Sequence, residues 1–199
     1  MSVDLSAGNL VDDTLPAQID SILATHGVPL ELLELEVTES AIITEPVRAI
    51  DLLNQLADRG IRISIDDVGV GYTSLGQLKN LQVSELKIDR SFVMSMADDR
   101  SNALIVRSVV DLGPALGLTP VAEGVENEEI LARLADLGCD VTQGYHLSRP
   151  APAAAFDAWC ADRRLAASRA SGGPRDTIGQ GAARLPEIPR QAVRSSGRR

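Results

Sequence analysis

Residues 61–75 read IRISIDDVGVGYTSL and combine a strand with two adjacent carboxylates. Three isoleucines alternate with polar residues, which predicts a half-buried β-strand that leads directly into Asp66 and Asp67. A glycine-containing loop follows the two acids. Adjacent acids at a strand end repel each other, and a cation bound between them relieves this repulsion. The stretch therefore indicates a cation site, to which other parts of the chain should supply further oxygen ligands.

The size and composition of the chain predict one globular domain. Its 199 residues are enough for a sizeable core, and 3% aromatic residues against 44% hydrophobic residues predict an aliphatic interior. No apolar run reaches the length of a membrane span, and no signal peptide is recognisable after Met1, so we expect a cytoplasmic protein. Cys139 and Cys160 lack metal-binding spacing and are expected to be reduced thiols.

Charge is distributed unevenly along the chain. The formal net charge is −9, yet residues 166–199 hold seven Arg and only two acids. This stretch is rich in Gly, Pro, Ser and Arg, which predicts a disordered tail after a folded domain at 1–165. The acidic body argues against general nucleic-acid binding, so we expect a solvated or self-associating tail.

Short strand-like runs alternate with helical periodicity through the first 165 residues. Repeated β-then-α units predict parallel strands covered by helices, an α/β fold. The expected strands are Ser2–Leu5, Leu33–Val37, Ile61–Ile65, Glu85–Ile88, Thr119–Ala122 and Asp140–Gly144. The expected helices span residues 14–26, 45–58, 99–116, 126–137 and 152–165.

A polar residue stands at or near the carboxyl end of every expected strand. These residues are Asp4, Glu36, Asp66, Lys87, Glu123 and Gln143. A doubly wound sheet concentrates its site at one switch point, whereas a (β/α)₈ barrel places functional groups on many strand ends around one mouth. The pattern therefore favours a TIM-like (β/α) barrel, of which about six of eight strands are recognisable.

Most of these strand-end residues are acids, which points to metal-dependent phosphoryl chemistry. The carboxylates among them are Asp4, Glu36, Asp66 and Glu123. Ligands that are all oxygen suit Mg²⁺ or Mn²⁺ better than Zn²⁺. Asp67 offers a ligand to a second ion, and two ions about 3.5–4 Å apart are the usual device for attack on a phosphodiester. Lys87 would hold the attacking water or a phosphate oxygen.

Taken together, the motifs resemble the EAL-type cyclic diguanylate (c-di-GMP) phosphodiesterase domain. The matching segments are SVDLS (2–6), LELEVTES (33–40), SIDDVGVGYTSL (64–75), ELKIDRSF (85–92), VAEGVE (121–126) and QGYHLSRP (143–150). They follow the family's order and spacing over roughly residues 1–160. The resemblance implies a barrel with one antiparallel strand, and hydrolysis of c-di-GMP to the linear dinucleotide pGpG with Mg²⁺ or Mn²⁺.

The resemblance also implies roles for individual residues. Glu36, Asp66 and Glu123 match ligands of one metal ion and Asp67 matches a ligand of a second. Lys87 matches the lysine beside the nucleophilic water, and Glu123 is a candidate general base.

Further roles concern the substrate and a loop. Gln143 lines the same centre, and Arg149 and Pro150 lie where such domains contact the nucleotide. Glu39 matches the acid that holds the loop after the double aspartate. That loop, residues 68–75, is expected to couple homodimerisation to metal binding.

The sequence departs from the family pattern in three places. Its signature Glu-Ala-Leu strand and the preceding antiparallel strand are not found before residue 2, so a truncated barrel is expected. Asp4 stands where Asn is usual, and Val68 and Val70 replace the residues common in the loop. Three interpretations therefore stay open: a c-di-GMP phosphodiesterase, an inactive module that binds c-di-GMP or a protein partner, and a non-functional fragment.

Overall fold

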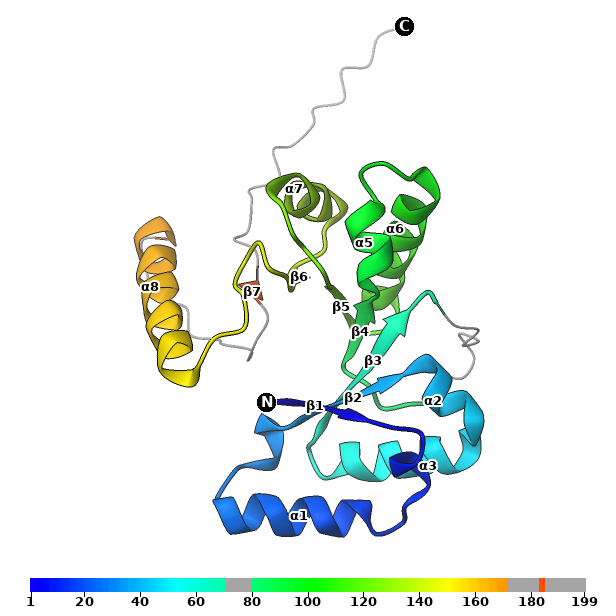
Figure 1. The fold of residues 1–199 in the computed structure, drawn as a ribbon. Coiled ribbons are helices and arrows are strands. Elements are labelled where there is room, and N and C mark those ends of the chain that lie inside the picture. Colours follow the sequence, from blue (N-terminus) through cyan, green and yellow to red (C-terminus); the bar gives the residue numbers. More distant parts are fainter. Residues whose placement is uncertain (71–79, 172–182, 185–199) are drawn as a thin grey trace, which may run out of the picture.

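A sheet with its strands in chain order forms the centre of the molecule (Figure 1). The computed structural model describes residues 1–70, 80–171 and 183–184. The first six strands are parallel, and the seventh pairs antiparallel with the sixth. The strands are β1 (Ser2–Leu5), β2 (Glu34–Thr38), β3 (Arg62–Val68), β4 (Glu85–Ile88), β5 (Thr119–Ala122), β6 (Val141–Thr142) and β7 (Ala183–Arg184).

Helices such as α3 and α6 follow strands and pack on the outer side of the sheet, whereas α8 stands apart from it (Figure 1). Helix α3 contacts β3, and α6 contacts β4 and β5. Within the described residues β1 and β7 are not paired with each other, so the strands form an incomplete TIM-like barrel. The helices are α1 (Leu15–His26), α2 (Glu39–Thr44), α3 (Pro46–Asp58), α5 (Arg90–Ser95), α6 (Arg100–Ala115), α7 (Glu128–Leu137) and α8 (Ala153–Ser171), with 3₁₀ turns η1 (Asn9–Val11) and η2 (Leu30–Leu32).

Local sequence signals fix where several helices begin and end. The carboxylate of Asp99 accepts hydrogen bonds from the backbone N–H groups of Ser101 and Asn102 at the start of α6. Helix α7 ends at Gly138, whose φ of 80° lies in the left-handed region that glycine adopts without strain. These signals explain why the predicted helix boundaries lie close to the observed ones.

The two faces of the sheet differ sharply in polarity. On β3, Ile63 and Ile65 are buried in the hydrophobic core on the helix side. Arg62, Ser64 and Asp66 alternate with them and face the concave inner side of the sheet, because successive strand residues point to opposite faces. The apolar outer face therefore holds the helices, and the inner face is free to carry polar groups.

Strand β3 differs from its prediction in a way that affects the two aspartates. It extends to Val68, so Asp66 and Asp67 lie within the strand, whereas the prediction placed them beyond its end at Ile65. The pairing with β4 shifts register between Ile65 and Val68, which marks a β-bulge. Asp67 has a φ of 56° in this bulge, a conformation that Asp tolerates better than most residues. Alternation alone could not predict the irregularity.

Other elements also differ from their predictions. The sequence reading missed the six-residue helices α2 and α5, because each is shorter than two full turns of apolar periodicity. The expected strand at 140–144 is only two residues long.

Part of the stretch that was expected to form a disordered tail has a regular structure. In the stretch 166–199, helix α8 continues to Ser171 and Ala183–Arg184 pair with β6, while the rest lies outside the described residues. The domain boundary at 165 stays a prediction. None of the described helices is long and apolar enough to cross a bilayer.

The packing of β3 leads to a first prediction. Ile65, which directly precedes Asp66 on β3, is fully buried in the hydrophobic core. Loss of part of its side chain therefore leaves a cavity. We expect Ile65→Val to lower the free energy of unfolding by about 1 kcal/mol and Ile65→Ala by about 2–5 kcal/mol. Urea unfolding checks this, and equal effects of the two variants would contradict it.

Candidate metal centre

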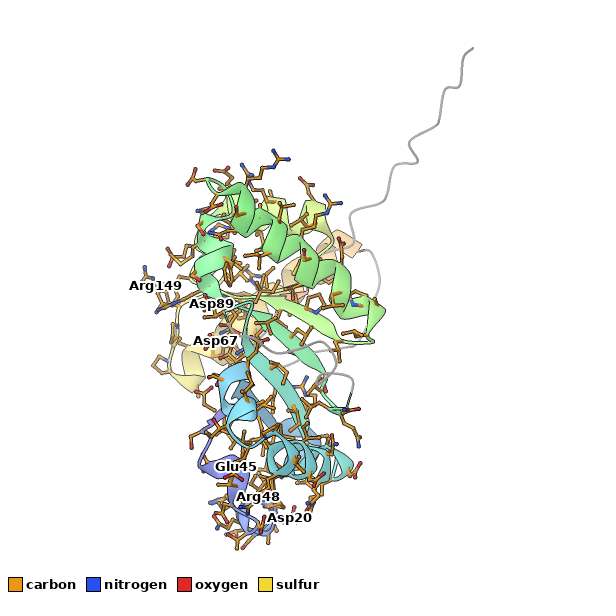
Figure 2. The ribbon with its side chains drawn as sticks, turned by 90° about the vertical axis from the view of Figure 1, so that its right-hand side faces the viewer. Asp20, Glu45, Arg48, Asp67, Asp89 and Arg149 are labelled. Carbon is orange, nitrogen blue, oxygen red and sulfur yellow. The ribbon has the colours of Figure 1, made fainter. Side chains whose placement is uncertain are left out.

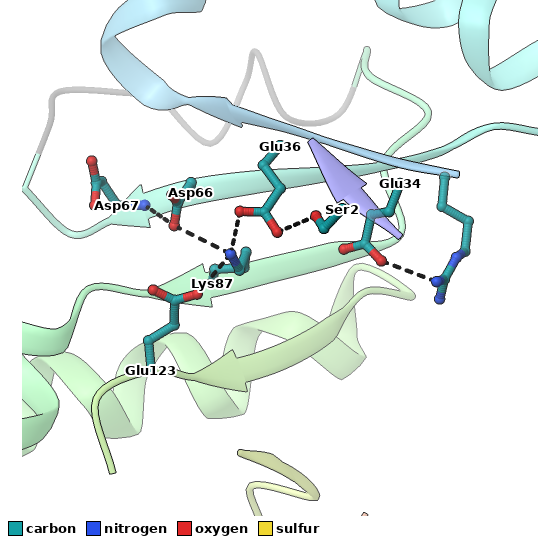
Figure 3. A network of polar contacts seen from close by, with 8 residues as sticks. Ser2, Glu34, Glu36, Asp66, Asp67, Lys87 and Glu123 are labelled. Carbon is teal, nitrogen blue, oxygen red and sulfur yellow. Dashed lines mark hydrogen bonds and ion pairs between the residues drawn. The ribbon is translucent and has the colours of Figure 1, made fainter. Parts of the chain in front are cut away.

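Lys87 lies at the centre of a group of carboxylates on the inner face of the sheet (Figure 3). Its side chain comes from β4 and the residue is only 5% exposed. The Nζ atom lies 2.5 Å from Glu36 Oε2 on β2 and 2.6 Å from Glu123 Oε1 after β5. It lies 3.9 Å from Asp66 Oδ1 on β3. One ammonium group therefore links acids from three different strands.

Two of these acids, Glu36 and Asp66, also converge with Asp4 beside the lysine. Asp4, Glu36 and Asp66 each offer a carboxylate oxygen, and these atoms lie within 4.8 Å of one another. The Ser2 hydroxyl donates a hydrogen bond to Glu36 Oε1, the oxygen that Lys87 does not contact. Three converging carboxylates, with no histidine or cysteine beside them in the part of the chain that the structure describes, form a donor set that fits a hard divalent cation.

Burial makes this group of charges unfavourable by itself. Burial raises the pKa of Asp66, although the nearby Lys87 charge opposes the shift. Burial likewise raises the pKa of Glu123 against its hydrogen bond with Lys87. For Lys87 burial disfavours the charged form, but hydrogen bonds to Glu123 and Glu36 outweigh it and raise the pKa above its usual value. A charged lysine thus meets a surplus of acids, which favours binding of a further cation.

Asp67 lies near Asp89, whereas Asp66 lies near Lys87. Its backbone N–H donates a hydrogen bond to Asp66 Oδ1 at 2.9 Å. Burial, followed by the charges of Asp66 and Asp89, raises the pKa of the Asp67 carboxyl group. Figure 2 shows Asp67 and Asp89 in the same region of the molecule. Asp67 is not one of the three carboxylates whose oxygens lie within 4.8 Å of one another, although the charge of Asp66 still acts on it.

The residues expected to contact substrate follow β6. Gln143 is exposed and is held through its backbone, whose N–H donates to Ala122 O and whose carbonyl accepts from Val125 N. Arg149 and Pro150 are exposed, and the Arg149 guanidinium lies 4.8 Å from the centre of the Tyr145 ring. The structure thus places them on a surface segment beyond β6, and among the described residues no hydrogen bond or ion pair joins them to the carboxylates.

The loop prediction falls mostly outside the described residues. Glu39 is buried at the start of α2. Of the segment 68–75, only residues 68–70 are described, so the expected roles of Glu39 and of this loop in dimerisation stay predictions.

Sequence reasoning missed two residues that the structure brings to the site. Ser2 contacts Glu36, and Asp89 lies beside Asp67. A signal for Ser2 was present, because it stands two residues before Asp4 and so shares its face of β1. Asp89 caps α5 in the structure by accepting a hydrogen bond from the backbone N–H of Ser91, and no sequence pattern signalled its proximity to Asp67.

Comparison with known proteins agrees with this geometry. The EAL domain family matches residues 1–150. MucR of Pseudomonas aeruginosa, a bifunctional diguanylate cyclase/cyclic di-GMP phosphodiesterase, is 44% identical over 153 residues, which cover 77% of this chain and 22% of MucR. The cyclic di-GMP phosphodiesterase RocR of the same organism is 34% identical over 160 residues, covering 80% of this chain and 41% of RocR.

Solved structures show the same relationship. The PaMucR phosphodiesterase in complex with c-di-GMP superposes with a TM-score of 0.75 at 43% identity, covering 78% of this chain and 63% of that one. The EAL domain of Mycobacterium smegmatis DcpA gives a TM-score of 0.74 at 36% identity, covering 81% of this chain and 72% of that one.

The fold and the strand-end acids define an α/β barrel protein of the TIM-like class. The chain belongs to the EAL domain family, and its barrel is of the EAL type. It spans about a fifth of the length of the first curated relatives it matches, at 21%, 20% and 22%.

The central lysine leads to a second prediction. Lys87→Met leaves the half-buried carboxylates of Glu36 and Glu123 without their shared cation, so we expect the metal-free protein to lose about 3 kcal/mol of unfolding free energy. Urea unfolding in a chelator measures this. Arg133→Met, which removes an exposed ion pair with Glu129, is the matched control and should cost at most about 0.5 kcal/mol. Equal losses in the two variants would contradict a linking role for Lys87.

The segment after β6 leads to a third prediction. A Cβ atom at Gly144 would lie 2.1 Å from the carbonyl oxygen of Val125, so no side chain fits there. We expect Gly144→Ala to displace the Gln143 segment and to lower the melting temperature strongly. At Gly8 a Cβ atom would meet only Ser6 Oγ at 3.7 Å, so Gly8→Ala is the control and should leave the melt almost unchanged. Similar melting curves for both variants would show that the close approach is not maintained.

Proposed function

We propose that the chain is a metal-dependent phosphodiesterase that hydrolyses c-di-GMP to pGpG in second-messenger signalling. The observation that carries the proposal is the convergence of oxygens from Asp4, Glu36 and Asp66 beside the Lys87–Glu123 pair. Relatives named as cyclic di-GMP phosphodiesterases support the choice of substrate. A structure titled as a c-di-GMP complex of a related phosphodiesterase supports it further.

The proposed cofactor is Mg²⁺ or Mn²⁺. Asp4, Glu36 and Asp66 would hold one ion, and their all-oxygen donor set fits either metal. Asp67 is the proposed ligand of a second ion. Glu123, which forms an ion pair with Lys87, is a further proposed metal ligand. Such ions supply Lewis-acid polarisation of a phosphoryl group and lower the pKa of bound water.

Lys87 and Glu123 are the proposed catalytic pair. The Lys87 ammonium is fixed by two carboxylates, so it can stabilise negative charge on a phosphate oxygen without first being reoriented. Burial raises the pKa of Glu123, which makes its carboxylate a better proton acceptor than an exposed glutamate. We assign Glu123 the removal of a proton from the attacking water.

Substrate contacts are proposed for the segment after β6. Gln143, Arg149 and Pro150 are exposed there, and the guanidinium of Arg149 can pair with a phosphate. Homodimerisation through residues 68–75 and a cytoplasmic location complete the proposal.

A second candidate function is an inactive module that binds c-di-GMP. One observation favours it: both oxygens of Glu36 already accept hydrogen bonds, from Ser2 and Lys87. A metal ion must then share or displace these contacts. Binding without turnover distinguishes this candidate from the enzyme.

Hydrolysis assays provide the fourth prediction. With Mn²⁺ or Mg²⁺ and c-di-GMP we expect pGpG as the product, and Asp66→Asn and Glu123→Gln should each lower kcat at least about 100-fold. Chromatography of the products measures this, and Asp98→Asn, at an exposed turn, is the control with unchanged activity.

Two outcomes would contradict the enzyme. Saturable c-di-GMP binding without product would favour the binding module. A chain that shows no cooperative melt, even with metal and c-di-GMP present, would contradict both functions and favour a non-functional fragment.

A further inference from the structure

A second ionic cluster lies beneath the carboxylates, toward the amino ends of the same strands. Arg62 on β3 forms an ion pair with Glu34 on β2, in which Arg62 Nη2 lies 3.0 Å from Glu34 Oε2. The Nη1 atom of Arg62 lies 3.6 Å from Oε1 of Glu85 on β4. Glu34 is 8% exposed, so its charge is largely removed from water. Figure 3 shows Glu34 on the same inner face as Glu36. One guanidinium group therefore joins three neighbouring strands.

The three members of this cluster precede the site residues on their own strands. Glu34 stands two residues before Glu36, and Glu85 stands two residues before Lys87. Arg62 stands four residues before Asp66. Residues at even spacing along a strand share a face, so the ionic cluster forms the layer directly below the candidate metal centre. The strand register agrees, because Glu34 is paired with Arg62 and Glu36 with Ser64.

The inner-face residue of β3 between Arg62 and Asp66 contributes little packing below the candidate metal centre. Ser64, the inner-face residue between Arg62 and Asp66, is fully buried, and its small side chain fills little space. Its Oγ atom and Arg62 Nε are buried with no hydrogen-bond partner among the described residues. Backbone hydrogen bonds hold β2, β3 and β4 side by side, and at this level the two-sided contact of Arg62 ties together the side chains on their inner face.

We propose that Arg62 is a positioning residue for the candidate metal centre. By holding Glu34 and Glu85 on either side, it keeps the layer of side chains directly below Glu36, Asp66 and Lys87 from rearranging. The inference rests on the proposed function, since it assumes that Glu36 and Asp66 bind a metal ion. Partners that orient ligands typically change metal affinity by about 10–100-fold when they are removed.

The test measures metal affinity directly instead of activity. Isothermal titration of the full chain with MnCl₂ should show Mn²⁺ binding at least about tenfold weaker for Arg62→Met than for the unmodified protein. Arg62→Lys keeps the positive charge but cannot present the two-pronged guanidinium, so it should recover only part of the affinity. Arg133→Met, an exposed arginine that also pairs with a glutamate, is the matched control and should bind Mn²⁺ normally.

A triple variant separates positioning from simple burial of charge. In E34Q/R62M/E85Q the unpaired carboxylates are gone, so the fold should be recovered even where Arg62→Met unfolds. If the triple variant melts cooperatively yet binds Mn²⁺ about tenfold more weakly, positioning by Arg62 is supported. If it or Arg62→Met binds Mn²⁺ as tightly as the unmodified protein, the inference is wrong. If the unmodified protein itself binds no Mn²⁺, the proposed function has failed at its metal site.

Discussion

The ion-paired ammonium group of Lys87 is the interaction on which the arrangement of the site depends. Carboxylates from β2, β3 and the end of β5 approach one another on the inner face of the sheet, where water offers limited screening. Without a cation among them their mutual repulsion would disfavour this arrangement of charged side chains. Lys87 supplies one positive charge, and the remaining excess of negative charge is what makes binding of a divalent ion favourable.

This arrangement is possible because the two faces of the sheet have separate tasks. Isoleucines, leucines and valines on the outer face bind the helices and provide the hydrophobic stabilisation. The inner face holds two polar layers, with Arg62 between Glu34 and Glu85 below and Lys87 among the acids above. The alternation of a strand thus lets one short segment, such as β3, serve both the core and the site.

Much of this could be predicted from the sequence, and the exceptions have physical causes. Strand-end acids and repeated β-then-α units predicted the parallel barrel, because both patterns are local in sequence and repeat from strand to strand, and the resemblance of the motifs predicted its EAL type. The bulge that turns Asp67 toward Asp89 could not be predicted, since a register shift depends on the partner strand. Arg62 was missed for a related reason: its role comes from neighbours on other strands and not from its own segment.

The most direct test of the account is a crystal structure with Mn²⁺ bound, recorded with anomalous diffraction. We predict an anomalous peak coordinated by carboxylate oxygens of Asp4, Glu36 and Asp66, beside the Lys87 ammonium group. An absence of any peak at saturating Mn²⁺, or a peak held by other residues while Lys87 still bridges Glu36 and Glu123, would contradict the central claim that these carboxylates form a metal centre.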